Sequence, residues 1–399
     1  MQKTNNNIIP KKTDLLATAF NEAKLAKNSN KNVIDAVVGS LSDENGDFFV
    51  FKSVSDIFAK LSKKEIFEYN SSSESVKFKN YMFDWIFSDL ADEFNKKFTI
   101  SSVVSPGSST SLYISLFVNN KFPTLNSSFS WPAYRTMSEV VGQEYLEYEM
   151  FNKELKFNFT NFSNAVTTIL KKNKGINIIF NDPCHNPTGY TLAENEWVEI
   201  ISFLNKFPDK EINIILDTAY AEFSHHNRSF LKKILMCSKN INIFLCYSCS
   251  KTFTIYGLRL GIMFALSSND YSNEFKKCSR AIFSNPPAFP ISIVNKLFGD
   301  KKYFNSYVSE LNEKIKLLDE RAEIFINEAK KCKLIHCEYR GGFFILIPCK
   351  NPVDVYEKLK KQNIYIAPLD GGIRIAISYI TKKEIKNLAK KIYDAIQNT

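Results

Sequence analysis

The sequence predicts an α/β fold built on a largely parallel β-sheet. Three runs rich in β-branched and other apolar residues, 176–180, 212–216 and 241–247, predict buried strands. Helical patterns separate them, and strands that alternate with helices are typical of a parallel sheet with both faces covered. A chain of 399 residues is long enough for one large domain and a smaller one.

Composition indicates an ordinary globular protein, with 44% hydrophobic and 24% charged residues. No apolar run reaches the roughly 18 residues of a membrane span, so we expect no membrane partner. Residues 1–7 are polar and lack the apolar centre of a signal peptide, which predicts a cytoplasmic protein.

The formal net charge of +10 raises the possibility of a nucleic-acid or anionic-membrane partner. The lysines, however, are scattered along the whole chain among glutamates and asparagines and form no basic stripe. This distribution predicts a solvated surface and no nucleic-acid partner.

All eight cysteines follow residue 183, and Cys246 and Cys249 form a C-x-x-C pair. Such a pair can bind zinc or act in redox chemistry. There is no second pair with zinc-like spacing, and Cys246 lies in an apolar strand pattern. We therefore expect buried, reduced thiols and no metal.

Polar clusters follow the three predicted strands. The first strand leads into a loop containing Asn186, the second ends at Asp217 and Tyr220, and the third runs into Ser248 and Lys251. In parallel sheets, ligands bind outside the carboxyl ends of the strands. Polar residues end strands in many proteins, but three clusters with complementary chemistry predict a site at this edge.

The remaining chain predicts further helices and strands. Thr191 and Glu194 predict a capping box for the helix after the first strand, and residues 71–73 predict a loop. The C-terminal third predicts a smaller α/β domain linked by a long helix, and a helix at 14–26 is expected to pack against it. Its predicted elements are helices 306–333 and 351–362, strands 343–347, 364–367 and 373–378, and a last helix capped by Thr381 and Glu384.

Seven motifs together carry a resemblance to a known family: Val38-Gly39, Ser105-Pro106-Gly107, Ser130-Trp131-Pro132, Asn186-Pro187-Thr188-Gly189, Asp217-x-Ala219-Tyr220, Ser248-x-Ser250-Lys251 and Arg374. From about Val37 to the last helix, the chain resembles fold-type I pyridoxal-phosphate enzymes, most closely class I aminotransferases of the aspartate/aromatic group. This implies a cofactor-binding domain, 46–304, with a mostly parallel seven-stranded sheet sandwiched by helices. Residues 1–45 would pack with a small C-terminal domain, 305–399.

The resemblance implies roles for the residues at the strand ends. Lys251 matches the lysine that forms a Schiff base with pyridoxal 5'-phosphate and then moves a proton on the substrate. Asp217 would pair with the protonated pyridine nitrogen, while Tyr220 and Asn186 would hydrogen-bond the phenolic oxygen of the cofactor. The plainer alternatives are a surface lysine and a strand-end aspartate.

Further residues match the positions that hold the cofactor. Ser248 and Arg259 would bind its phosphate, together with Ser108 and Ser109 in a loop that is usually richer in glycine. Trp131 would stack on the ring, the alternative being a core tryptophan. Tyr134 stands where many family members have histidine. Tyr69 resembles a tyrosine that reaches the phosphate of the neighbouring subunit, which implies a homodimer with shared active sites.

Substrate binding is implied for two arginines. Arg374 matches the arginine that clamps the α-carboxylate, and Gly39 would let the backbone approach the same group. Arg280 has the spacing of the arginine that binds a second carboxylate across the dimer. Trp131 and Asn186 would complete the substrate site. The alternatives are a solvent-facing strand arginine and an ordinary surface arginine.

The resemblance implies an aminotransferase that moves an amino group from an L-amino acid to a 2-oxo acid. Aspartate is the first choice of donor, an aromatic amino acid the second, and 2-oxoglutarate the expected acceptor. A C–S lyase or a decarboxylase on the same fold is an alternative, because the cofactor supports several bond cleavages. A ligand-sensing regulator is another, although the short N-terminal segment leaves little room for a DNA-binding module.

Overall fold

The computed structural model describes residues 15–29, 32–225 and 228–399, which form two compact units. The larger unit comprises Phe48–Asp319 and Glu338–Phe343. The smaller unit comprises the described residues up to Asp47 together with Glu320–Cys337 and Phe344–Thr399. The division falls inside helix α14 (Lys301–Cys332), and the predicted limits 1–45, 46–304 and 305–399 stay a prediction.

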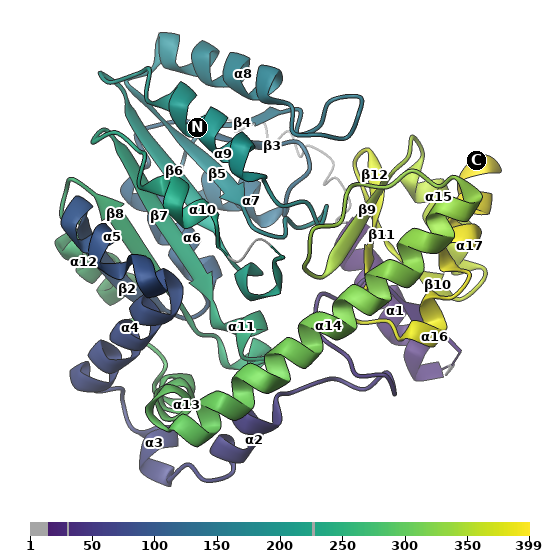
Figure 1. Ribbon diagram of the computed structural model, residues 1–399, viewed down its shortest axis with the longest axis horizontal. Coiled ribbons are helices and arrows are strands. Elements are labelled where there is room, and N and C mark those ends of the chain that lie inside the picture. The colour runs from purple at the N-terminus through teal and green to yellow at the C-terminus, as the bar shows by residue number, and fades with distance from the viewer. Residues whose placement is uncertain (1–14, 30–31, 226–227) are drawn as a thin grey trace, which may run out of the picture. The chain divides into compact units, whose positions relative to one another are not determined.

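The larger unit is built on a seven-stranded sheet with the strand order β2-β8-β7-β6-β5-β3-β4 (Figure 1). Strand β8 runs antiparallel to both of its neighbours, and the other pairs are parallel, which confirms the predicted mostly parallel sheet. The bounds are β2 (Thr99–Ser105), β3 (Thr124–Ser127), β4 (Tyr145–Tyr148), β5 (Gly175–Asn181), β6 (Glu211–Asp217), β7 (Ile241–Ser248) and β8 (Gly261–Ser267).

Alternate residues of the central strands face opposite helix layers, as the period of two requires. Ile179 and Ile215 belong to a buried cluster with residues of α6 (Ser108–Val118), α7 (Ala133–Val140) and α12 (Ser272–Ile282). Their neighbour Phe180 contacts Phe162 of α8 (Phe159–Lys172) and Trp197 of α9 (Glu194–Leu204). Both faces of the sheet are therefore covered by helices.

Further helices surround this core and complete the larger unit. They are α2 (Lys52–Phe58), α3 (Lys63–Phe67), α4 (Ser72–Phe87), α5 (Ala91–Lys97), α10 (Phe230–Ile234), α11 (Cys249–Thr252), α13 (Ala288–Gly299) and the first part of α14, with single 3-10 turns at Ser88–Leu90, Ala221–Phe223 and Tyr256–Leu258.

The smaller unit combines elements from both ends of the chain. Strand β1 (Ile34–Asp35) pairs in parallel with β10 (Ile364–Tyr365), so an N-terminal and a C-terminal segment share one unit, as predicted. A three-stranded antiparallel sheet has the order β11-β12-β9. Its strands are β11 (Ala367–Leu369), β12 (Gly372–Ala376) and β9 (Phe344–Pro348), and the helices are α1 (Leu15–Ser29), α15 (Pro352–Lys360), α16 (Lys382–Ile385), α17 (Leu388–Gln397) and the last part of α14.

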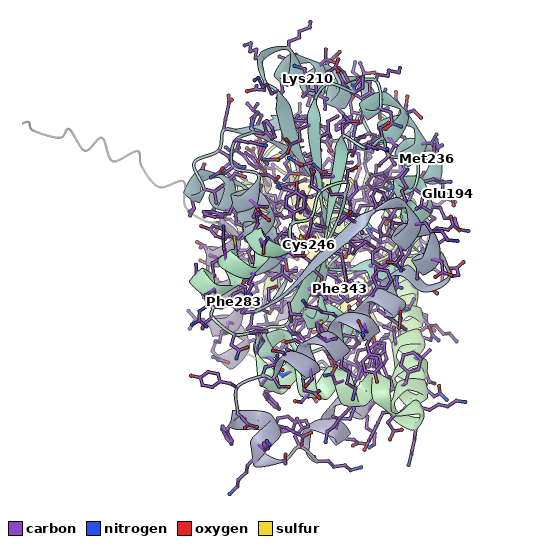
Figure 2. The ribbon with its side chains drawn as sticks, turned by 90° about the vertical axis from the view of Figure 1, so that its left-hand side faces the viewer. Glu194, Lys210, Met236, Cys246, Phe283 and Phe343 are labelled. Atoms are coloured by element: carbon purple, nitrogen blue, oxygen red, sulfur yellow. The ribbon has the colours of Figure 1, made fainter. Side chains whose placement is uncertain are left out.

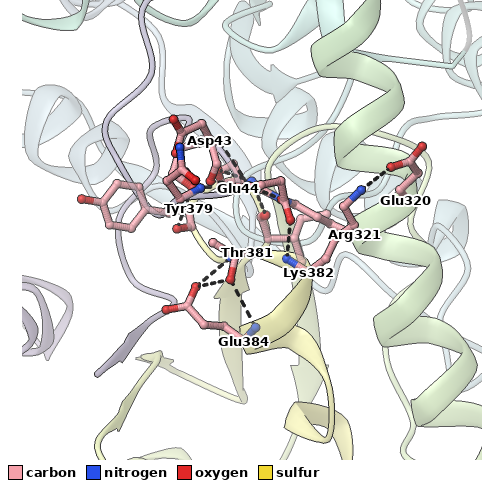
Figure 3. Close-up of polar contacts among 12 residues, drawn as sticks. Asp43, Glu44, Glu320, Arg321, Tyr379, Thr381, Lys382 and Glu384 are labelled. Carbon is pink, nitrogen blue, oxygen red and sulfur yellow. Dashed lines mark hydrogen bonds and ion pairs between the residues drawn. The ribbon is translucent and has the colours of Figure 1, made fainter. Parts of the chain in front are cut away.

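Arg321 of α14 is the polar centre of the smaller unit (Figure 3). It is fully buried and donates through Nε to a carboxylate oxygen of Glu44 over 2.9 Å. Its other nitrogens donate to the carbonyls of Ser42, Asp43 and Ser378. A buried guanidinium needs many acceptors, and these hydrogen bonds supply them. They hold the segment 42–44 and the segment around Ser378 against α14.

Two local predictions were wrong at helix starts. Thr191 does not cap α9; its hydroxyl accepts the N–H of Cys184, while the carboxylate of Glu196 accepts the N–H of Ala193 over 2.7 Å. The capping carboxylate therefore lies two residues later than expected. Residues 71–73 are not a loop, because Ser71 caps α4 by accepting the N–H of Glu74.

Two predicted elements are each divided in two. The expected strand 364–367 is split into β10 and β11, which pair with different partners. The last helix begins at Thr381 with the predicted capping box to Glu384, but it is interrupted between α16 and α17. Asn387 there has a left-handed φ of 65°, a conformation that asparagine tolerates better than most residues.

None of the eight cysteines is paired in a disulfide, and Cys246 and Cys249 are fully buried, as expected; their reduced state stays a prediction. Within residues 15–29, 32–225 and 228–399, none of the helices combines the length and apolar character that crossing a membrane requires.

Candidate active site

The strand register brings several of the predicted site residues of the larger unit to one edge of the sheet. Asn181, Asp217 and Cys246 lie side by side at the ends of β5, β6 and β7. Figure 2 labels Cys246 at this edge and Lys210, which precedes β6, at the opposite edge. Because three parallel strands end together, the side chains that follow them meet there, as predicted.

Two donors hydrogen-bond the carboxyl group of Asp217. The hydroxyl of Tyr134 donates to Oδ2 over 2.6 Å, and the N–H of Ala219 donates to Oδ1 over 3.1 Å. Asp217 is 4% exposed, and this burial raises its pKa, while the Tyr134 bond and the charge of Lys251 lower it. Burial also raises the pKa of Tyr134 well above its usual value, so Tyr134 stays a donor.

Lys251 follows β7 in the short helix α11. Desolvation lowers the pKa of its amine, and the nearby charge of Asp217 opposes that shift. Its Nζ lies 5.4 Å from the centre of the Tyr220 ring. Lys251, Asp217 and Tyr220 are therefore brought together as predicted, and the plain surface lysine is not what the structure contains.

Asn186 is fastened to the same edge by its backbone. Its N–H donates to Oδ1 of Asn181 over 2.7 Å, and Nδ2 of Asn181 donates to the carbonyl of Asp217 over 2.9 Å. The sequence reasoning missed Asn181. Its position as the last residue of β5, opposite the last residue of β6, is the feature that identifies it.

A second group of residues forms a cationic cradle beside Lys251. Gly261 pairs with both Ser105 and Ser248, which places the start of α6 next to the end of β7. Gly107, the N-cap of α6, has a φ of +81°, and a Cβ there would lie 2.3 Å from Nη2 of Arg259. Ser108, Ser109 and Arg259 thus share one small region.

Arg259 is oriented by the chain around it. Its Nη1 donates to Oγ of Ser250 over 3.1 Å and to the carbonyl of Tyr256 over 2.8 Å. Ser248 instead caps α11, since its hydroxyl accepts the N–H of Ser250. A guanidinium close to the N-terminus of an eleven-residue helix attracts anions.

Trp131 and Tyr220 flank this edge. Trp131 is half-buried, and its ring meets that of Tyr134 edge to face with centroids 5.4 Å apart. Tyr220 is 5% exposed and packs against Phe343 at 5.2 Å. Trp131 is thus linked through Tyr134 to Asp217.

Two predicted residues of the larger unit are exposed rather than gathered at this edge. Tyr69, just before α4, is 88% exposed. Arg280 lies on the exposed side of α12.

Arg374 and Gly39 belong to the smaller unit and lie together there. Arg374 is 5% exposed; its Nη2 donates to the carbonyl of Val37 over 2.7 Å, and its guanidinium carbon lies 4.2 Å from the centre of the Phe344 ring. A Cβ on Gly39 would lie 3.0 Å from the same ring. Arg374 is therefore not a solvent-facing arginine.

The fold and the strand-end lysine and aspartate define an α/β enzyme. The family of class I and II aminotransferases matches residues 31–392, and the chain belongs to this family. It is a transaminase, an enzyme that moves amino groups.

Several relatives agree with this assignment. The mitochondrial aspartate aminotransferase of Saccharomyces cerevisiae is 22% identical, covering 92% of this chain and 89% of its own. The tyrosine aminotransferase of Rhizobium meliloti is 22% identical over 88% and 90% of the two chains. A crystal structure of an aminotransferase from Anaerococcus prevotii is 27% identical, with a TM-score of 0.91 over 99% of both chains.

The fold is shared with more distant enzymes. The aromatic-amino-acid aminotransferase of Burkholderia pseudomallei, solved with covalently bound pyridoxal phosphate, has a TM-score of 0.81 at 18% identity. It covers 99% of this chain and 100% of its own.

Proposed function

We propose that this aminotransferase uses pyridoxal 5'-phosphate to move an amino group from an L-amino acid, aspartate or aromatic, to a 2-oxo acid such as 2-oxoglutarate. The observation that carries the proposal is the pairing of a desolvated amine, Lys251, with a buried carboxylate, Asp217, at one edge of the sheet. The amine is needed to bond the aldehyde of the cofactor covalently, and the carboxylate is needed to pair with the cationic ring, so both must lie at one place.

The residues present fit this cofactor. Gly107 leaves the space beside Arg259 that a side chain would fill, and the guanidinium and the start of α6 suit a phosphate. Asp217 offers a carboxylate to a ring nitrogen, and Asn186 and Tyr220 offer an amide and a hydroxyl to a phenolic oxygen. A half-buried Trp131 beside Tyr134 offers an aromatic face.

When bound, the cofactor supplies an aldehyde for the amine of Lys251 and a ring that accepts electron density. Lys251 would act as a base and take a proton from the Cα of the donor amino acid. In the second half of the reaction it would act as an acid and give a proton to the corresponding carbon of the 2-oxo acid. Desolvation lowers its pKa, so a larger share of the amine is free to act as a base at neutral pH. Asp217 would keep the ring nitrogen protonated, because its two donors favour the ionised carboxylate.

Substrate binding is assigned to the smaller unit and to the partner subunit. Arg374 would bind the α-carboxylate, with Gly39 leaving room for it. In a homodimer, Arg280 would bind a second carboxylate on the substrate held by the neighbouring subunit. Tyr69 would bind the phosphate of the cofactor in that subunit. The exposure of Tyr69 supports this role, since a tyrosine 88% exposed in one chain is available to another. We place the protein in the cytoplasm.

The test is a half-reaction on purified enzyme loaded with pyridoxal phosphate. Donor amino acid alone should convert the absorption of the cofactor to that of its amine form, and 2-oxoglutarate should restore it. Lys251→Ala should lower turnover by at least about a thousandfold. Lys79→Ala, at another partly buried lysine of the larger unit, is the matched control. Release of free ammonia or carbon dioxide in place of 2-oxo-acid-dependent turnover would contradict the proposal and indicate a lyase or a decarboxylase.

A further inference from the structure

The segment Glu338–Phe343 belongs to the larger unit, although the chain on both sides of it belongs to the smaller one. The N–H of Gly342 donates to the carbonyl of Phe223 over 3.0 Å. Gly341 has a φ of +114°, and a Cβ there would lie 2.4 Å from the same carbonyl oxygen. Because the two backbones approach so closely, this segment is fixed on the turn that follows β6, and it holds Arg340 at a defined place.

Arg340 contacts three consecutive residues of the loop that contains Asn186. Its N–H donates to the carbonyl of Gly189 over 3.1 Å. Its guanidinium carbon lies 4.4 Å from the centre of the Tyr190 ring, and Nη1 donates to the carbonyl of Thr191 over 2.7 Å. A guanidinium combines a planar face with directed donors, so this one side chain binds a ring and a carbonyl together.

These loop residues in turn hold the chain that leads into Asn186. The carbonyl of Tyr190 accepts the N–H of His185 over 2.8 Å. The hydroxyl of Thr191 accepts the N–H of Cys184 over 2.9 Å. All four of these bonded residues are buried. A shift of residues 190 and 191 would therefore displace Asn186 as well, since close-packed interiors transmit such shifts.

Two carboxylates flank the guanidinium of Arg340, whose side chain is 14% exposed. Its Nη2 lies 2.9 Å from Oε2 of Glu338, and its Nη1 lies 3.8 Å from Oε2 of Glu196. The other oxygen of Glu196 accepts the hydroxyl of Tyr190 over 2.6 Å. The loop is therefore held by Arg340 and by the first turn of α9, and the two carboxylates set the direction of the guanidinium.

We propose that Arg340 is a positioning residue for amino-group transfer, which holds the loop so that the side chain of Asn186 meets the phenolic oxygen of the cofactor. The inference rests on the proposed function, which assigns Asn186 to that oxygen. A hydrogen bond weakens steeply as its geometry departs from the preferred angle. A displacement of about 1 Å caused by a distant change can lower a rate about a hundredfold, so a side chain that touches no reacting atom can still set the rate.

The experiment compares Arg340→Met with the unaltered enzyme, both loaded with pyridoxal phosphate. The phenolic oxygen is part of the chromophore, so a displaced Asn186 should change the absorption maximum and the visible circular dichroism of the bound cofactor. We expect turnover to fall about tenfold to a hundredfold. The KM of the donor amino acid should change less than about twofold, because its carboxylate is assigned to another residue. Borohydride should still place the label on Lys251.

Lys156→Met is the matched control. Lys156 also pairs with Glu338, and its side chain is 54% exposed. This variant should keep the absorption, the dichroism and the turnover of the unaltered enzyme. Arg340→Lys keeps the charge and a donor but loses the planar face over Tyr190, so its turnover should lie between those of the unaltered enzyme and Arg340→Met.

Unchanged absorption, dichroism and turnover in Arg340→Met would overturn the inference, even if thermal unfolding showed a less stable protein. Equal losses in Lys156→Met would overturn it too. If Arg340→Met does not fold, unchanged values in Arg340→Lys would do the same. If the unaltered protein holds no cofactor on Lys251, the proposed function fails as well. If it does hold one and the Arg340 variants match it, only this inference fails.

Discussion

The hydroxyl of Tyr134 donates a 2.6 Å hydrogen bond to Oδ2 of Asp217, and both side chains are buried. Helix α7 thereby holds the carboxylate that ends β6. The sequence showed Tyr134 only as an unusual residue at its position, whereas the structure shows its phenol as a donor to Asp217. Burial opposes ionisation of Asp217, and this bond favours it.

Tyr134→Phe should therefore weaken cofactor binding about tenfold to a hundredfold, because a hydrogen bond to a charged group contributes about 1.5–3 kcal/mol. The loss should be larger in acid than at neutral pH, since the pKa of Asp217 rises further without the donor. The measurement is a titration with pyridoxal phosphate, followed by its absorption. Tyr134→His keeps a donor and should recover part of the affinity. An unchanged affinity in Tyr134→Phe at every pH would remove the role.

Gly107→Ala tests the cationic cradle. A methyl group there would meet Nη2 of Arg259 at 2.3 Å and would also adopt a φ of +81°. We expect pyridoxal phosphate to bind at least about tenfold more weakly, because the guanidinium must move from its place beside α6. Gly142→Ala has a similar φ of +79° with nothing within 4 Å, so it separates backbone strain from crowding. Equal losses of affinity in both variants would contradict the cradle.

Asp182 and His185 line one small cavity. As the pH rises, the contribution of Asp182 to the free energy of unfolding should fall and that of His185 should rise. Burial raises the pKa of Asp182 to about 7, so its contribution is present below 3.8 and is lost as the pH rises towards 7. Burial lowers the pKa of His185 to about 3, so its contribution is present above 6.5 and is lost as the pH falls towards 3.

Replacing either residue should therefore reveal how the other one changes the free energy of unfolding with pH. Between pH 3.8 and 6.5, the free energy of unfolding of His185→Gln should fall with rising pH relative to the unaltered protein, by up to about 1.4 kcal/mol per pH unit. Asp182→Asn should show a relative rise of similar size. Urea unfolding at a series of pH values measures both, and parallel curves for all three proteins would refute the opposition.

Arg321→Met should destabilise the smaller unit by about 3 kcal/mol or more, since it leaves Glu44 and several carbonyls without their buried donor. Lys382→Met is the control. Its bridge to Glu320 is exposed to solvent, so its loss should matter far less. Comparable unfolding midpoints for the two variants would show that the buried guanidinium does not hold the unit together.

The strand-end residues were predictable because apolar runs and the polar residues after them are local features. Asp217 follows one such run directly and Lys251 comes four residues after another, so the parallel sheet brings them to one edge. Asn181 also follows an apolar run directly, but its bond to the carbonyl of Asp217 depends on strand register. Tyr134 acts from a helix packed on the sheet, so no local feature reveals its bond to Asp217.

The residues that cap a helix were harder to predict. Thr191 and Glu194 fit a capping box, yet Glu196 makes the bond to Ala193 while Thr191 bonds Cys184. Several residues could cap this helix, and tertiary contacts select among them.

The central claim is a covalent bond between one lysine and an aldehyde cofactor. Borohydride reduction of the enzyme loaded with pyridoxal phosphate, followed by proteolysis and peptide mapping, tests it directly. We predict a stable pyridoxyl label on Lys251. A label on any other residue, or none, would contradict the account.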